Sequence, residues 1–217
     1  MKIFKNILLL KKEIKGINSL NFVPTMGGLH KGHESLLKKA KINNNKLLVS
    51  IFINPKQFNS KKDFDNYPKH LKKDFKILKK YKVDYLYTPS FSDIYSFKTK
   101  NKIFLDKTSK LLCGRFRKKH FLGVIDVVNR LIEVIKPKKL YLGKKDYQQL
   151  HLIKKHVDKR NIQIKIIECK TIREKNGVAC SSRNKNLSAN ELIIASKVFK
   201  YIKKLKNYIK KNKKKPH

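Results

Sequence analysis

The chain has 217 residues, 40% of them apolar, so it can bury a core large enough for one α/β domain with a small appendage, which excludes wholesale disorder. Its 55 Lys and Arg residues against 15 Asp and Glu give a formal charge of +40, which attracts nucleotides, phosphates, carboxylates or nucleic acid. The excess is nearly all lysine, without an arginine-rich stripe and interleaved aromatic residues, so we expect a solvated lysine surface rather than nucleic-acid binding.

The cysteine pattern and the short apolar runs together predict where in the cell the protein is found. Cys113, Cys169 and Cys180 have no CxxC spacing, which argues against a zinc site or a disulfide framework and favours the cytoplasm. Residues 1–16 contain only a short apolar run broken by two lysines, and this pattern predicts an amphipathic helix rather than a signal peptide. No stretch approaches the roughly 18 apolar residues that span a bilayer, so we expect no membrane partner.

Extended apolar runs alternate with helical patterns along the chain. We expect strands at residues 19–24, 46–54, 83–89, 138–143 and 162–169. Apolar residues that recur with the helical period of about 3.6 residues predict helices at residues 31–43, 68–81, 123–136 and 146–159. Together they predict an α/β fold, a Rossmann-like parallel sheet with helices on both faces. The polar stretches PTMGG, NPKQF and GKKD each follow a strand and should meet on one rim, beyond the carboxyl ends.

The pattern changes after about residue 184. A long helical stretch follows and ends in a run of lysines, and Ser188 with Glu191 has the spacing of a capping box. We therefore divide the chain into a Rossmann-like nucleotide-binding and catalytic domain, residues 1–175, and a mainly helical C-terminal segment, residues 176–217.

The stretch NFVPTMGGLHKGHESLLKKA holds the strongest chemical signal. A strand that enters Gly27 and Gly28 and then a helix makes an anion site, because glycine lets the backbone approach a ligand and the helix start offers free N–H groups. His30 and His33 share one helix face and could donate to phosphate oxygens. A surface histidine pair or a lone metal site is the alternative. The preceding PTMGG and the intervening Gly32 favour nucleotide binding.

The HKGH tetrapeptide resembles the HxGH signature of the nucleotidyltransferase superfamily that includes class I aminoacyl-tRNA synthetases. The fuller string PTMGGLHKGHESLL resembles the pantothenate synthetase (pantoate–β-alanine ligase) family. The resemblance continues, over about residues 20–190, in VSIFINPKQF, FDNYPKHLKKD, HFLGVIDVVNRL, KPKKLYLGKKDYQQL and TIREKNGVACSSRN. Six motifs in order are far more specific than any one of them.

This resemblance implies a two-step reaction. The carboxylate of pantoate attacks the α-phosphate of ATP, giving pantoyl adenylate and pyrophosphate, and the amine of β-alanine then attacks the acyl carbon to give pantothenate and AMP. It implies Mg²⁺, placed at Asp74, and a homodimer. The residues that it assigns to ATP are Thr25, Met26, Gly27, Gly28, His30, His33, Gly143, Lys144, Lys145, Asp146, Ile172, Cys180, Ser181, Ser182 and Arg183.

Within that set, the residues expected to act on the departing phosphates are His30, His33, Lys145, Ser181, Ser182 and Arg183. Those expected to bind pantoate or β-alanine are Asn54, Gln57, Arg117, His120 and Gln149. Structural roles stay open for several of them. Asn54 and Gln57 could be a polar loop after a strand, Asp146 could cap a helix, and His120 could cap the helix near residue 123.

The chain departs from the family pattern in places. Cys180 stands where Met is usual, Asp126 where Thr is usual, and Lys73 where an acid commonly precedes Asp74. Family members carry a fuller C-terminal domain that closes over the site, so residues 176–217 are expected to form a shortened lid. Two alternatives are another HxGH-type adenylyl- or nucleotidyltransferase, which the Gln57 and Gln149 pair argues against, and a catalytically eroded, basic nucleic-acid-binding protein.

Overall fold

The computed structural model describes residues 1–42 and 45–212. Its centre is a six-stranded sheet in which every paired strand is parallel, in the order β1-β4-β3-β2-β5-β6. This confirms the predicted α/β class. The strands are β1 (Lys2–Phe4), β2 (Leu20–Thr25), β3 (Lys46–Ile51), β4 (Tyr85–Tyr87), β5 (Lys139–Gly143) and β6 (Lys165–Cys169).

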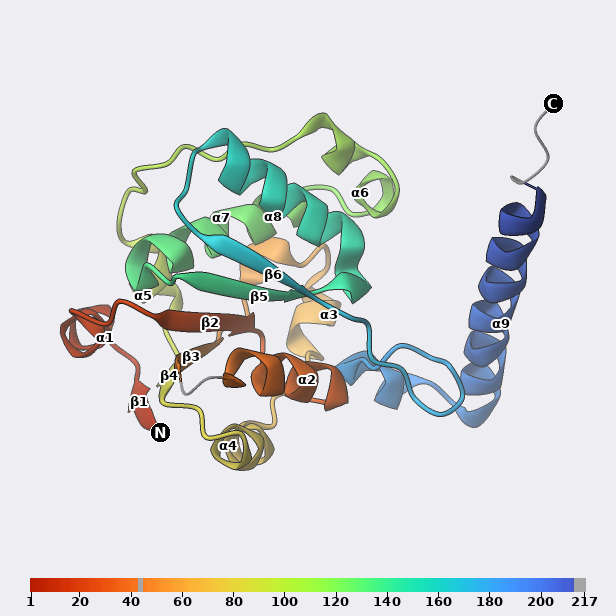
Figure 1. Cartoon of the computed structure of the whole chain (residues 1–217), viewed down its shortest axis with the longest axis horizontal. Helices are drawn as coiled ribbons and strands as arrows, with labels where there is room; N and C mark the ends of the chain where they lie inside the picture. Colours follow the sequence, from red (N-terminus) through yellow and green to blue (C-terminus); the bar gives the residue numbers. More distant parts are fainter. Residues whose placement is uncertain (43–44, 213–217) are drawn as a thin grey trace.

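Helices cover both faces of the sheet, as predicted (Figure 1). The longer ones are α1 (Ile7–Ile14), α2 (Lys31–Ala40), α4 (Leu71–Lys80), α7 (His120–Ile135), α8 (Tyr147–Lys159) and α9 (Ala189–Asn212). Three short helices, which the sequence patterns did not predict, lie in the connections: α3 (Lys61–Asp65), α5 (Phe91–Tyr95) and α6 (Cys113–Phe116).

Two apolar cores hold the layers together. One packs α1, α7 and α8 against residues such as Phe22, Leu48 and Leu140, while the other packs α2 and α4 against Val23 and Val49. Successive residues of β2, Phe22 and Val23, thus face opposite cores, as the two-residue period of a strand requires. Burial on both faces explains why these strands read as continuous apolar runs.

The predicted helix near the N-terminus is present as α1, which begins at Ile7. The sequence did not show that Lys2–Phe4, before it, form the edge strand β1. The side chain of Asn6 stops the strand and caps the helix, because its Oδ1 accepts hydrogen bonds from the N–H groups of Leu8 and Leu9. A three-residue edge strand is too short to leave a two-residue period in the sequence.

The C-terminal helix α9 projects away from the sheet domain (Figure 1). Ser188 and Glu191 form the predicted capping box, since each backbone N–H donates to the other side chain. Phe199 joins α9 to the 173–179 turn, with the guanidinium of Arg173 3.8 Å from its ring centroid. The large apolar side chains along α9 are exposed, for example Tyr201 at 67% and Leu205 at 58%.

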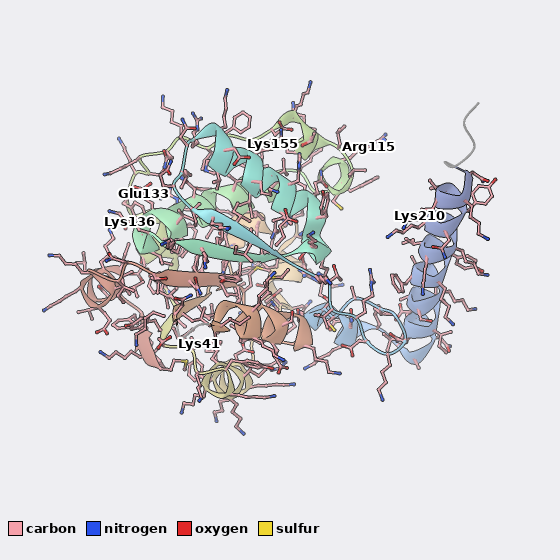
Figure 2. The ribbon with its side chains drawn as sticks, viewed as in Figure 1. Lys41, Arg115, Glu133, Lys136, Lys155 and Lys210 are labelled. Atoms are coloured by element: carbon pink, nitrogen blue, oxygen red, sulfur yellow. The ribbon has the colours of Figure 1, made fainter. Side chains whose placement is uncertain are left out.

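The basic side chains are spread rather than gathered. Figure 2 shows nitrogen-tipped side chains projecting around the whole outline of the domain and along α9. This distribution agrees with the solvated lysine surface expected from the composition. None of the helices in the described part of the chain is long and apolar enough to cross a membrane.

The strand order places the site. Going from β2, the chain adds β3 and β4 on one side, and β5 and β6 later on the other side. The connections therefore diverge between β2 and β5, and in open parallel sheets ligands bind at the carboxyl ends of the strands at such a point. PTMGG follows β2 and GKKD closes β5, so the predicted rim lies at this point.

Candidate active site

A cavity of about 230 Å³ opens at the carboxyl ends of β2 and β5. Its walls come from the turn after β2 and the start of α2, from the β5–α8 junction, from α7, and from residues 170–183. Fourteen of the residues predicted for the site line it: Thr25, Met26, His30, His33, Gln57, Gly143, Lys145, Asp146, Gln149, Ile172, Cys180, Ser181, Ser182 and Arg183.

His30 and His33 build the start of α2. His30 is the N-cap, and its Nδ1 accepts a hydrogen bond from the N–H of Gly32 at 3.1 Å. In return, Nδ1 of His33 accepts from the N–H of His30 at 3.3 Å. The rings lie 4.1 Å apart, and a Cβ on Gly32 would stand 2.8 Å from Cε1 of His30. The HxGH spacing is therefore a capping box made of imidazoles, and it needs glycine beneath the first ring.

Burial keeps both rings neutral, and the cap fixes which ring nitrogen carries the hydrogen. Burial lowers the pKa of His33 to about 3, with help from His30 and Lys145, and burial followed by Lys145 lowers the pKa of His30. Both imidazoles are thus neutral at pH 7. Because each Nδ1 accepts an N–H bond, the hydrogen of each ring sits on Nε2. The pair can donate to an anion without carrying charge itself.

The glycine turn differs from the expected open cradle. Gly27 and Gly28 have φ of +81° and +63°, a left-handed conformation that favours glycine. Their N–H groups do not face a ligand, however. The N–H of Gly27 donates to Oγ1 of Thr25, and those of Gly28 and Leu29 donate to the carboxylate of Asp74 at 2.9 and 2.8 Å. The N–H groups of these two glycines therefore hold the turn together and are not free to bind an anion.

Asp74 was predicted to hold Mg²⁺, and the structure gives it a different task. Its side chain comes from α4, is only 1% exposed, and uses one oxygen for Gly28 and the other for Leu29. Among the described residues no group of three or more His, Cys, Asp or Glu side chains could hold a metal ion. Asp74 shapes the turn that presents Met26 and His30, and it does not line the cavity.

Gln57 enters the cavity from the short 3-10 turn Pro55–Gln57 after β3. Its Nε2 lies 2.9 Å from Sδ of Met26, and its Oε1 accepts from Nδ2 of Asn54 at 3.3 Å. Asn54 is 1% exposed and does not line the cavity. It caps the turn through the N–H of Lys56 and donates to the carbonyl of Gly123. Asn54 therefore supports Gln57, and only Gln57 of these two residues lines the cavity.

His120 and Arg117 also lie outside the cavity lining. His120 opens α7, and its Nδ1 is 2.6 Å from the carbonyl oxygen of Gln57. This contact anchors the Gln57 turn to α7, whereas the predicted helix cap does not form, because the start of α7 has no side-chain cap hydrogen bond. Arg117 is half-buried, and burial followed by the charge of Arg183 lowers its pKa. Its guanidinium adds positive charge near the mouth.

The β5–α8 junction separates its two lysines. Lys145 lines the cavity, and its Nζ lies 3.1 Å from Oδ1 of Asp146. Lys144, predicted to bind ATP, instead points to the outside and pairs with Glu168 of β6 at 2.9 Å. Of the two adjacent glutamines, Gln149 lines the cavity while Gln148 binds the backbone of the 108–113 loop.

The last wall is the 170–183 segment. The carbonyl oxygen of Ile172 accepts a hydrogen bond from the N–H of Cys180, so this carbonyl is already paired inside the segment. Cys180 is 1% exposed, and burial together with Glu174 raises the pKa of its thiol to about 11, so it stays protonated. Its Sγ donates to Glu174 at 3.1 Å. The cysteine in the position usually held by Met is therefore an inert part of the wall.

The Ser181–Arg183 stretch closes the mouth. Oγ of Ser181 accepts from the N–H of Arg183, and the guanidinium of Arg183 pairs with Asp63 of α3 at 3.1 Å. Tyr67, which the sequence reasoning did not select, is buried here beneath Arg183, whose Cζ lies 5.3 Å from its ring centroid. The YP pair within FDNYPKH, already part of the resemblance, was the signal that could have found it.

The chain was compared with known proteins. The family model described as pantoate-beta-alanine ligase matches residues 2–216. The pantothenate synthetase of Buchnera aphidicola subsp. Schizaphis graminum is 45% identical over 98% of this chain and 76% of its own length. That of Francisella tularensis subsp. novicida is 45% identical over 85% of this chain and 71% of its own length.

Solved structures agree. The pantoate-beta-alanine ligase of Francisella tularensis, complexed with beta-gamma ATP and beta-alanine, matches with a TM-score of 0.86 and 43% identity, over 92% of this chain and 78% of that one. The pantothenate synthetase of Thermus thermophilus matches with a TM-score of 0.86 and 33% identity, over 92% of this chain and 72% of that one.

Proposed function

The chain belongs to the pantoate–β-alanine ligase family, and we propose that it condenses pantoate with β-alanine at the cavity between β2 and β5, using ATP and releasing AMP and pyrophosphate. The observation that carries this assignment to particular residues is the neutral imidazole pair at the cavity wall, with both Nε2–H groups available to an anion. Pantoyl adenylate is the intermediate that joins the two half-reactions.

The phosphate end is proposed to lie between α2 and the 181–183 turn. Negative charge builds up on the bridging and terminal oxygens as pyrophosphate leaves the α-phosphate. Neutral imidazoles from His30 and His33 can donate hydrogen bonds to those oxygens, and Lys145 and Arg183 supply the positive charge. Little proton movement is required, so His33 acts as a clamp on the leaving group rather than as an acid.

The acyl end is proposed to lie against α7. Val127, Val128 and Leu131 form an apolar wall of the cavity, and Gln57 and Gln149 stand beside it. Pantoate has two methyl groups on its third carbon next to polar oxygens, so one side of it suits the apolar wall and the other suits amide donors. A neutral amide binds a carboxylate or hydroxyl oxygen without pairing a full charge against the nucleophile.

The metal, the assembly and the compartment are also proposals. Both oxygens of Asp74 accept backbone hydrogen bonds, and Asp74 does not line the cavity, so we propose that Mg²⁺ arrives on the phosphates of ATP. The family resemblance supports a homodimer, and the three free thiols, Cys113, Cys169 and Cys180, support a reducing cytoplasm.

The organisation of the chain remains a proposal as well. We propose that residues 1–175 carry the catalytic domain and that residues 176–217 act as a lid segment. The exposed ion pair between Arg183 and Asp63 supports this division, because it is the kind of contact that can exchange when a segment moves.

The test is a pyrophosphate-release assay. We expect release from ATP to require pantoate, and pantothenate and free AMP to form together only when β-alanine is added. Release that does not depend on pantoate would favour another nucleotidyltransferase. Tight RNA binding with a steep salt dependence and no ATP binding would favour the nucleic-acid alternative.

A further inference from the structure

Tyr95, the last residue of α5, lies behind the Gln57 turn and outside every motif that carries the family resemblance. Its hydroxyl donates a hydrogen bond to Oδ1 of Asn54 over 2.9 Å. Asn54 in turn donates from Nδ2 to Oε1 of Gln57 over 3.3 Å. Two hydrogen bonds thus connect the phenol to the amide that faces the cavity.

The direction of these bonds sets the direction of the Gln57 amide. Burial and the charge of Asp126 raise the pKa of Tyr95, so the phenol keeps its hydrogen and donates. Oδ1 of Asn54 is therefore the acceptor, and its NH₂ group faces Gln57. Oε1 of Gln57 is then occupied, which leaves the Nε2–H groups on the side of Met26 and the cavity.

The phenol ring is itself held by charged neighbours. The ammonium of Lys56 lies 3.8 Å from the ring centroid, and the guanidinium of Arg130 lies 4.8 Å from it. Asp126, in the position where the resemblance leads one to expect Thr, joins these cations: it pairs with Arg130 at 2.7 Å and with Lys56 at 3.8 Å. Tyr95 and its three charged neighbours do not line the cavity, so their effect on a substrate must pass through Asn54.

We propose that Tyr95 is a positioning residue for the acyl substrate, which acts through Asn54 to keep the N–H groups of Gln57 directed into the cavity. The inference rests on the proposed function, in which Gln57 binds an oxygen of pantoate. Asn54 is also held by the carbonyl of Gly123 and the N–H of Lys56. Loss of one hydroxyl therefore loosens the amide without releasing it, and it affects pantoate rather than ATP.

The experiment compares Tyr95→Phe with a matched control, Tyr87→Phe. Tyr87 is buried in the same core, and its hydroxyl has no hydrogen-bond partner among the described residues. A net hydrogen bond of about 0.5–1.5 kcal/mol corresponds to about twofold to tenfold. We expect Tyr95→Phe to raise the KM for pantoate by that factor, with the KM for ATP and the Tm close to those of the wild type. Tyr87→Phe should leave the KM for pantoate, the KM for ATP and the Tm unchanged.

Two further arms separate positioning from general stability. In a Gln57→Ala background, Tyr95→Phe should have no further effect on the KM for pantoate, because the amide that it orients is gone. An unchanged pantoate KM in the single variant, an equal rise in the ATP KM, or a full additional effect in that background would overturn the inference.

A ligand-free readout covers the case in which the wild-type chain shows no pantoate-dependent activity, which would count against the proposed function. The side-chain NH₂ resonances of Gln57, assigned by their loss in Gln57→Ala, should shift in Tyr95→Phe and stay in place in Tyr87→Phe. Resonances that stay in place in both variants would overturn the positioning role by themselves.

Discussion

The two ends of the cavity are built in different ways. At the acyl end, Gln57 is held by Asn54, itself only 1% exposed, and by the anchoring contact of His120 with its backbone. At the phosphate end, Arg183 is held by an ion pair with Asp63 in which both side chains are more than 40% exposed. Buried hydrogen bonds resist rearrangement, whereas exposed ion pairs exchange at little cost. The acyl end is thus preorganised, and the phosphate end can adapt.

The largest effect is expected at the phosphate end, at His33. Replacing His33 by Gln keeps a side chain whose Oε1 can cap the N–H of His30, as Gln commonly does at this helix position, but the flexible amide N–H group no longer stands at the point held by the ring Nε2–H. We expect the rate of pyrophosphate release in a single turnover to fall by about 10²–10³-fold, the usual cost of one donor to a developing charge. The Tm should change little.

His33→Ala is the companion variant. It removes both the donor and the cap, so we expect the same loss of rate together with about 0.5–2 kcal/mol of stability, measured by urea unfolding. A His33→Ala enzyme that keeps its rate would show that the imidazole serves the helix alone.

A substitution at Asp74 tests whether this carboxylate holds the glycine turn or a metal ion. Asp74→Ala leaves the buried N–H groups of Gly28 and Leu29 without an acceptor, at a cost of about 1–3 kcal/mol for each. We expect a large loss of stability in urea unfolding, together with a loss of activity. Added Mg²⁺ should not restore the activity. Restoration by Mg²⁺ with unchanged stability would instead return Asp74 to the role of a metal ligand.

Much of this molecule could be predicted from the sequence, because its signals were strong there. Buried parallel strands leave apolar runs, and a helix cap leaves HxGH, so β2, α2 and their histidines were located correctly. The carboxyl-end rule then brought the three polar stretches to one rim.

What could not be predicted lies in contacts between segments that are distant in sequence. Asp74 and Gly28 are 46 residues apart, and Tyr95 and Asn54 are 41 residues apart. Whether a polar side chain faces a substrate or a backbone group depends on such contacts. This is why the sequence could not show that Asp74, Asn54 and Lys144 lie outside the cavity lining, and why Tyr67 and Tyr95 were missed.

Two buried histidines should make the stability of the domain depend on pH. His156 of α8 is 1% exposed, accepts from the N–H of Phe104 through Nδ1, and faces Oδ1 of Asn129 with Nε2. Burial lowers its pKa to about 4. The unfolded chain takes up the proton near pH 6.5, whereas the folded chain resists it, so stability is complete above pH 6.5 and is lost as the pH falls to 4.

Thermal unfolding between about pH 4 and 8 measures this. The Tm should fall below about pH 6.5, and His156→Gln, which removes the titrating group, should flatten part of that fall while lowering the Tm at neutral pH. His33, with a folded pKa of about 3, adds to the same window. A Tm that does not change between neutral pH and about pH 4.5 would contradict the burial of both rings.

The smallest effect on stability, and the sharpest test of the exchangeable phosphate end, comes from Asp63→Asn. An exposed ion pair contributes roughly 0–1 kcal/mol, so the Tm should hardly move. Arg183 loses its counter-ion, however, and becomes free to bind phosphate, so we expect the KM for ATP to fall by about twofold to threefold, an effect that salt weakens. Glu13→Gln breaks a comparable exposed pair with Lys2, far from the cavity, and should leave the KM unchanged. If the KM for ATP rises instead, Asp63 holds Arg183 in its working position, and the phosphate end is as preorganised as the acyl end.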